Sequence, residues 1–199
     1  YINDEMNRLK AIYPDIPLYA VISDVCASGG YYVAAAADKV FADKSSLVGS
    51  IGVMSNGFGF VGTMEILGVE RRLFTAGKNK GFLDPFSPLK PNEVAHYQQV
   101  LSEVHQQFVE VVRSGRGDRL VDQEQIFSGL VWSGERSVEL GLIDGLGGSS
   151  YVAREIFGAE SIVDFTRPLG LVDRIAQRAG VAMASSLWKQ INTSALGLP

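Results

Sequence analysis

The amino-acid sequence predicts a globular α/β fold, and three observations lead to this prediction. Segments with apolar residues at helical spacing alternate with short apolar segments that are typical of buried strands. One long amphipathic helix is predicted over residues 91–113. The chain has 199 residues, of which 46% are hydrophobic, and this is enough to bury the core of one domain or two small ones.

The first elements are typical of the second half of a βαβ unit. Apolar residues at helical spacing predict a first helix: Ile2, Met6, Leu9 and Ile12. Pro14 and Pro17 end this helix, and residues 18–25 then form a predicted buried strand. We expect the first strand of the unit to lie upstream of Tyr1. The chain also starts without an initiator Met or a targeting segment, so we expect it to be a piece of a longer protein.

The middle of the chain continues this alternation. Residues 31–37, rich in alanine, predict a short helix that packs closely on a sheet. Residues 39–43 and 46–54 are predicted strands, and Leu73–Thr75 is a further one. A loop rich in Gly, Lys and Pro follows.

The long helix predicted over residues 91–113 has a continuous apolar stripe. Its members are Val94, Tyr97, Leu101, Val104, Phe108 and Val111. Short helices should follow, with Ser133 as an N-cap and Gly141 as a C-cap. We expect a catalytic-type domain over residues 1–162 and a helical C-terminal extension over residues 163–199.

Composition and charge exclude several function classes. The chain carries 18 basic and 22 acidic residues and no basic run, which argues against nucleic-acid binding. Its longest run of apolar and small residues is far shorter than the roughly 20 residues of a membrane span. The single cysteine, Cys26, excludes an internal disulfide and a multi-thiolate metal site, and we expect it to be a small buried apolar residue. The glycines at 57, 59 and 62 have dinucleotide-type spacing but lack the acidic residue that binds ribose, so no cofactor is expected.

Ser28 is the first candidate for chemistry. It stands between a predicted strand and a predicted helix in the sequence DVCASGGYYVAAAAD, residues 24–38. Gly29 and Gly30 leave the backbone N–H groups at the helix start open to a developing oxyanion, so Ser28 resembles a nucleophile on a sharp turn. A serine in this position is also a common helix N-cap. The local sequence alone does not decide between the two roles.

A nucleophilic serine needs a base, and histidine is the commonest one. His96 and His105 both lie on the predicted long helix, where surface or packing roles suffice. A lysine can replace histidine if burial lowers its pKa by about 3 units, which corresponds to about 4 kcal/mol. Lys78 and Lys80 have the most apolar neighbours among the lysines that we compared. Three acidic residues are expected to be caps or turn residues and not catalytic carboxylates: Asp24, Asp38 and Asp144.

Four motifs in order give the chain a resemblance to a known family. They are ASGGYYVAAAAD, LVGSIGV, TAGKNKGFLDPFSP and GLVWSGERSVELGLIDGLGG. Together they resemble the bacterial signal peptide peptidase A family, serine proteases of the ClpP/crotonase fold, over about residues 1–150. The resemblance implies a fold of repeated ββα units with helices packed around the sheet.

The resemblance also implies roles for individual residues. Ser28 corresponds to the family's nucleophile, and Lys80, rather than Lys78, corresponds to its general base. Ser50 would orient that lysine, and Gly29 would supply one oxyanion N–H. A second oxyanion donor would come from the upstream strand, whose absence from this chain predicts weak activity.

The function implied by the resemblance is that of a Ser/Lys endopeptidase that cleaves apolar peptides such as remnant signal peptides, with activity that rises with pH. The resemblance further implies a ring-like homo-oligomer. It also implies attachment to the bacterial inner membrane through a segment absent from this chain, with the catalytic domain on the periplasmic or extracytoplasmic side. Two alternatives stay open. One is a non-catalytic fragment or pseudoenzyme that binds apolar peptides, and the other is acyl-CoA chemistry on the same fold.

Overall fold

The computed structural model describes residues 1–166 and residue 170. The chain divides into two compact units, Tyr1–Glu160 and Ser161–Pro199. In the second unit, residues 161–166 form neither helix nor strand. The C-terminal helix predicted within residues 163–199 otherwise falls outside the described residues.

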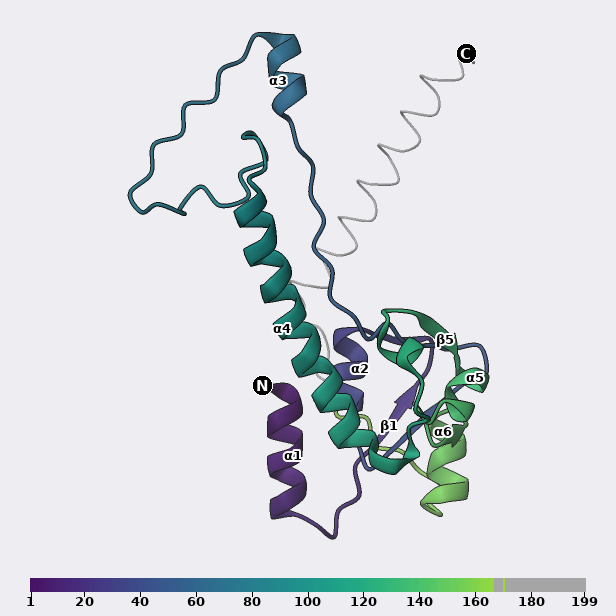
Figure 1. The fold of residues 1–199 in the computed structure, drawn as a ribbon. Coiled ribbons are helices and arrows are strands. Elements are labelled where there is room, and N and C mark those ends of the chain that lie inside the picture. The colour runs from purple at the N-terminus through teal and green to yellow at the C-terminus, as the bar shows by residue number, and fades with distance from the viewer. Residues whose placement is uncertain (167–169, 171–199) are drawn as a thin grey trace, which may run out of the picture. The chain divides into compact units, whose positions relative to one another are not determined.

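Two small sheets lie at the centre of the first unit (Figure 1). The first sheet has the strand order β1-β3-β6 and is parallel throughout: Tyr19–Ile22, Lys39–Ala42 and Gly145–Leu146. The second has the order β2-β4-β5: Val25–Ala27, Leu47–Gly49 and Val131–Ser133. In the second sheet β2 and β4 are parallel, and β5 is antiparallel to β4. Parallel pairing brings the carboxyl ends of β2 and β4 together.

Helices separate these strands along the chain. The α-helices α1 to α6 are Ile2–Ile12, Gly29–Ala34, Val61–Leu67, Pro91–Arg116, Gly134–Glu139 and Ser149–Tyr151. Three shorter helical segments are Gly117–Arg119, Glu124–Phe127 and Val152–Ile156. The order β1-β2-α2 followed by β3-β4-α3 repeats a ββα unit. The predicted α/β fold of the ClpP/crotonase type, with repeated ββα units, is therefore confirmed.

The two longer predicted helices are also confirmed. The first spans Ile2–Ile12, and α4 begins at Pro91, where proline suits the first helical position. The α4 helix continues about one turn beyond the predicted end and stops before Gly117, whose φ is 54°. The predicted N-cap is correct, since Ser133 accepts a hydrogen bond from the Arg136 backbone N–H. Gly141 follows α5 with a left-handed φ of 72°.

Several strand predictions are wrong in detail. The single strand predicted over residues 18–25 is two strands, because a bend after Ile22 takes the chain from the first sheet to the second. The strand predicted over residues 46–54 ends at Gly49, since Ser50 turns the chain with a φ of 51°. Leu73–Thr75 is not a strand: it is exposed and pairs with no strand of the described chain. The segment Val131–Ser133, expected within short helices, is the strand β5.

The core joins α2 and α4 to the sheets. Tyr31 of α2 and Val112 of α4 are fully buried, in one apolar cluster with residues of β3 and β4. A side chain at Gly115 would collide with the Ala35 carbonyl, so α4 approaches the alanine-rich end of α2 closely. The Tyr31 hydroxyl donates a hydrogen bond of 2.5 Å to the Leu142 carbonyl, and burial raises the pKa of Tyr31.

We expect Tyr31→Phe to lower the free energy of unfolding by about 1–2 kcal/mol, because it leaves the buried Leu142 carbonyl without this donor. Urea unfolding followed by circular dichroism measures the change. The exposed Tyr13→Phe is the matched control and should leave stability unchanged. Equal effects of the two variants would contradict a stabilising role for this hydrogen bond.

Candidate active site

Ser28 lies on a sharp turn between β2 and α2. Its φ of 52° and ψ of −123° are strained for a residue other than glycine, and such strain costs about 1–3 kcal/mol. Two backbone hydrogen bonds hold the turn: the Ser28 N–H donates to the Gly49 carbonyl at 2.8 Å, and its carbonyl accepts from Tyr32 at 3.0 Å. The hydroxyl makes no capping hydrogen bond to α2, and the residue is exposed. Ser28 therefore does not act as a side-chain N-cap, and its hydroxyl is left available.

Ser50 occupies the equivalent position one strand away. It follows β4 as Ser28 follows β2, and the parallel register pairs Ala27 with Gly49, so the two serines leave adjacent strand ends. The Ser50 φ is 51°, and its N–H donates to the Leu130 carbonyl at 2.8 Å. The structure therefore places two serines with positive φ at neighbouring strand ends.

A cavity of about 820 Å³ joins these residues. Ser28, Gly29 and Ser50 all line it. Its other walls come from α2, from α4, from the segment after β4 and from residues 127–129 before β5: Tyr32, Gly52, Val53, Met54, Val104, His105, Gln107, Phe108, Phe127, Ser128 and Gly129. Most of the larger side chains in this wall are apolar, and a volume of this size suits part of an extended peptide.

The backbone around Ser28 suits an acyl-transfer site. The first N–H groups of a helix have no partner within it, and Gly29 is the first residue of α2. No heavy atom would lie within 4 Å of a Cβ at Gly29, so the space beside it is open. Cys26 lies half-buried behind the turn, and burial raises the pKa of its thiol. Cys26 therefore stays a protonated, weakly reactive group, in agreement with its predicted packing role.

Lys78 and Lys80 do not line the Ser28 cavity. Both are exposed and belong to the loop that follows α3. This loop is fixed to the start of α4, where Phe82 packs on His96 and Tyr97 with ring centroids 5.7 and 5.8 Å apart.

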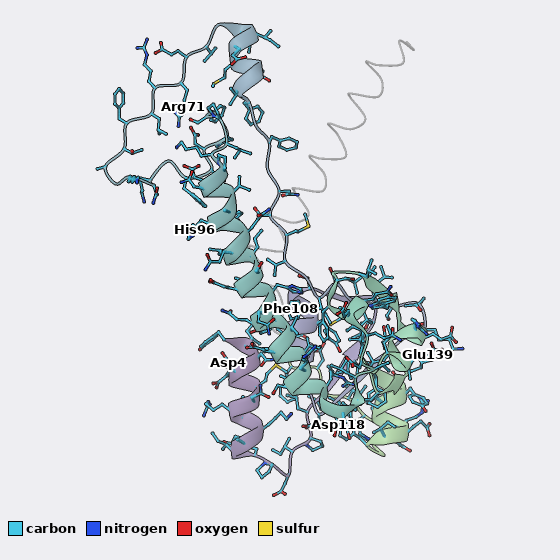
Figure 2. The ribbon with its side chains drawn as sticks, in the orientation of Figure 1. Asp4, Arg71, His96, Phe108, Asp118 and Glu139 are labelled. Carbon is cyan, nitrogen blue, oxygen red and sulfur yellow. The ribbon has the colours of Figure 1, made fainter. Side chains whose placement is uncertain are left out.

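The Ser28 cavity contacts α4 nearer to its C-terminal end than the loop that carries Lys80 does. It meets α4 at residues 104–108, whereas the loop meets it around His96, and from His96 to Phe108 the helix rises by about 18 Å. Figure 2 shows the same order, with Arg71 at one end, His96 next and Phe108 towards the sheets. Within one copy of the chain, Ser28, Ser50 and Gly29 come together, and Lys80 does not join them.

His105 is a residue of this site that the sequence did not single out for function. Its ring lines the Ser28 cavity, and its Nε2 atom is buried without a hydrogen-bond partner in the described part of the chain. A positional signal did exist. His105 precedes Phe108 by one turn, Tyr32 follows Ser28 by one turn, and Phe108 and Tyr32 pack with ring centroids 5.1 Å apart.

Asp38 and Asp144 hold parts of the fold together, and Asp24 lies exposed in the bend between β1 and β2. The Asp144 carboxylate accepts hydrogen bonds from Arg116 at 2.7 Å and from the Val40 N–H at 2.6 Å. Burial by itself raises the pKa of Asp144, but the Arg116 and Val40 hydrogen bonds outweigh it and the pKa is lowered overall. Asp38 pairs with Lys10 at 2.7 Å.

Comparison with known proteins identifies the family of this chain. Proteins named Na(+)/H(+) antiporter NhaA from Brucella abortus and Brucella melitensis are 41% identical over 169 residues, which cover 84% of this chain and 23% of each relative. A protein from Enterococcus faecium named putative signal peptide peptidase SppA is 32% identical, covering 83% of this chain and 47% of that protein. The chloroplastic serine protease SPPA of Arabidopsis thaliana is 34% identical over 72% of this chain and 21% of its own length.

The chain thus spans less than half the length of these relatives. A crystal structure of an enoyl-CoA hydratase/isomerase family member superposes with a TM-score of 0.40 and 14% identity over 99% of this chain and 57% of that chain. Among the described residues, no helix is both long and apolar enough to cross a membrane. The sequence profile of peptidase family S49 matches residues 11–160. Since this match covers most of the chain, the chain belongs to peptidase family S49.

Proposed function

We propose that this chain is the peptidase domain of a serine endopeptidase with Ser28 as nucleophile and Lys80 as general base. Ser28 Oγ attacks a peptide carbonyl carbon while the neutral Lys80 amine takes the hydroxyl proton, and the Gly29 N–H stabilises the oxyanion. The proton then passes to the leaving amine as the peptide bond breaks, which gives an acyl-enzyme that water hydrolyses.

The strained turn at Ser28 is the observation that carries this proposal. A hydroxyl that caps no helix, at a φ of 52°, opens into a cavity with a free helix-start N–H beside it. A structural serine would gain nothing from this conformation, whereas a nucleophile gains access to substrate from it. Membership of a peptidase family agrees with the same role.

Lys80 is supplied to this site by a second copy of the chain in the proposed enzyme. Within one copy its loop meets α4 at His96, about 12 Å along the helix from Val104, the first α4 residue of the Ser28 cavity. The segment that carries it also exposes several large apolar side chains: Met54, Phe58, Ile66, Leu67 and Phe74. Apolar surface of this kind marks an interface. A repeated head-to-tail contact between copies would give the ring-like homo-oligomer that the resemblance implies.

A mixture of two inactive variants tests this arrangement. Ser28→Ala and Lys80→Ala should each abolish hydrolysis of an apolar fluorogenic peptide. When they are co-expressed in equal amounts, about a quarter of the sites in a randomly mixed ring combine an intact Ser28 with an intact Lys80 from the neighbour. We therefore expect about a quarter of the wild-type activity to return. Mass spectrometry shows whether the oligomers contain both variants. If they do and no hydrolytic activity returns, the base belongs to the same chain as Ser28.

Apolar peptides are the proposed substrates. The cavity beside Ser28 has apolar walls, which include Val53, Met54, Val104, Phe108 and Phe127. An apolar residue on the acyl side of the cleaved bond would fill this space. Remnant signal peptides are such substrates, and an enzyme that acts on them would work beside the bacterial inner membrane on its extracytoplasmic side.

A second candidate function is peptide binding without catalysis. The observation in its favour is that Lys80 lies outside the Ser28 cavity in a single copy. A fluorophosphonate probe distinguishes the two functions, because only an activated serine attacks its phosphorus, displaces fluoride and forms a stable phosphonate ester. Labelling that is lost in Ser28→Ala supports the peptidase, and peptide binding without labelling supports the second candidate.

A further inference from the structure

His105 has an unused hydrogen-bonding atom at the wall of the Ser28 cavity. The imidazole lines the cavity, and its Nε2 is shielded from solvent without a partner in residues 1–166. A buried polar atom without a partner costs about 1–3 kcal/mol, so a group that pairs with it removes that cost. Because Nε2 is shielded in the free chain, the imidazole has to rotate about its Cβ–Cγ bond for this nitrogen to meet a group that enters the cavity with the substrate.

His105 lines the same cavity as the nucleophile. Tyr32 of α2 packs against Phe108 of α4, and both rings line the cavity. Ser28 precedes Tyr32 by one helical turn, and His105 precedes Phe108 by one turn on the other helix. The two residues therefore line one cavity from two different segments, each one turn from the same aromatic contact.

A bound peptide offers the group that His105 lacks. An extended peptide that enters an apolar cavity loses water from its main-chain N–H and C=O groups, and each needs a new partner. The side chains of this wall are largely apolar, which limits the available partners. An imidazole nitrogen can serve as a donor or an acceptor for such a group.

We propose that His105 is a substrate-binding residue that hydrogen-bonds the main chain of an apolar peptide next to the bond cleaved at Ser28. This inference rests on the proposed peptidase function and assigns a role in binding, not in proton transfer. It also explains why a polar residue lies beside Val104 and Phe108 on the apolar side of α4.

Steady-state kinetics with a fluorogenic peptide of Leu, Ala and Val residues provide the first test. His105→Phe keeps a ring of similar size without nitrogen, and we expect KM to rise about fivefold to tenfold with kcat within about twofold of wild type. His105→Gln retains a polar group of similar reach and should recover most of the lost affinity. Gln106→Ala is the matched control: its side chain bonds Glu110 on the exposed side of α4, and its KM should not change. His105→Ala, which adds no volume, replaces the Phe variant if the latter does not fold.

Two kinetic results would overturn the inference. One is an unchanged KM in both His105→Phe and His105→Ala. The other is a large loss of kcat at unchanged KM, which would mean that His105 transfers a proton.

Peptide binding to an inactive protein separates this inference from the proposed function. In Ser28→Ala, fluorescence anisotropy of a dye-labelled Leu/Ala/Val peptide should show saturable binding, and adding His105→Phe should weaken it by about fivefold to tenfold. Equal affinity of the two proteins refutes the role of His105 and leaves the peptidase intact. Absence of binding to Ser28→Ala at any concentration refutes peptide recognition by the cavity, and the role of His105 with it.

Discussion

Ser28→Ala is expected to lower peptide hydrolysis by a factor on the order of 10⁴ to 10⁶ and to abolish labelling by a fluorophosphonate probe. The loss is large because the remaining hydrogen-bond donors and the cavity polarise the substrate but provide no nucleophile. Initial rates with a fluorogenic apolar peptide, measured between pH 6 and pH 10, give the factor. The wild-type rate should rise with pH across this range, because only a neutral lysine amine can accept the Ser28 proton.

Stability measurements on the same variant distinguish a nucleophilic role of the Ser28 side chain from a helix-capping role. Loss of a capping side chain costs about 0.5–2 kcal/mol, whereas the Ser28 hydroxyl makes no capping bond. We therefore expect Ser28→Ala to unfold at the same urea concentration as wild type. Ser28→Gly should be more stable by about 1 kcal/mol while equally inactive, because glycine adopts a φ of 52° without strain. A Ser28→Ala variant that is both active and destabilised would restore the capping role. Ser45→Ala, at an exposed serine outside the cavity, is the control for activity.

The sequence predicts the sharp turn at Ser28 because its determinants are local. A strand, a serine and two glycines specify the turn, and the parallel pairing of two similar strands then places Ser50 beside Ser28. The motif order could be read without any structure, and each of the first two motifs includes a strand end. Local pattern also predicts α4 correctly, because an apolar stripe that continues from Val94 to Val111 leaves few alternatives to a helix.

The position of Lys80 and the strand expected at Leu73–Thr75 could not be predicted in this way. Residues 69–75 have strand-like composition but are exposed and unpaired, so tertiary contacts and not propensity decide their conformation. The position of Lys80 depends on how Phe82 packs against α4, which is a contact between distant side chains. The sequence predicted only a surface or packing role for His105 for a related reason: its environment is created by α2, which lies more than 70 residues earlier in the sequence.

Asp144→Asn is expected to have the largest effect on stability, about 3–5 kcal/mol at pH 7. The Arg116 side chain is fully buried, and its guanidinium donates to Asp144 and to the Gly141 carbonyl. Asparagine has a similar shape, but it leaves the arginine charge buried without a counter-charge. The sequence alone suggested only a turn residue here, because the partner lies on another element, the last turn of α4.

The pH dependence of this effect identifies its electrostatic origin. The pKa of Asp144 is lower in the folded than in the unfolded chain, so the carboxylate contributes stability above the unfolded pKa of about 3.9. That contribution is lost as the pH falls through the still lower folded pKa. Unfolding in guanidinium chloride at pH 7, 4 and 3 should therefore show that the difference in the free energy of unfolding between wild type and Asp144→Asn becomes smaller towards low pH. Glu135→Gln, which removes an exposed pair with Lys44, should cost little at any pH. If this difference in the free energy of unfolding does not depend on pH, Asp144 stabilises the fold through its shape and hydrogen bonds and not through its charge.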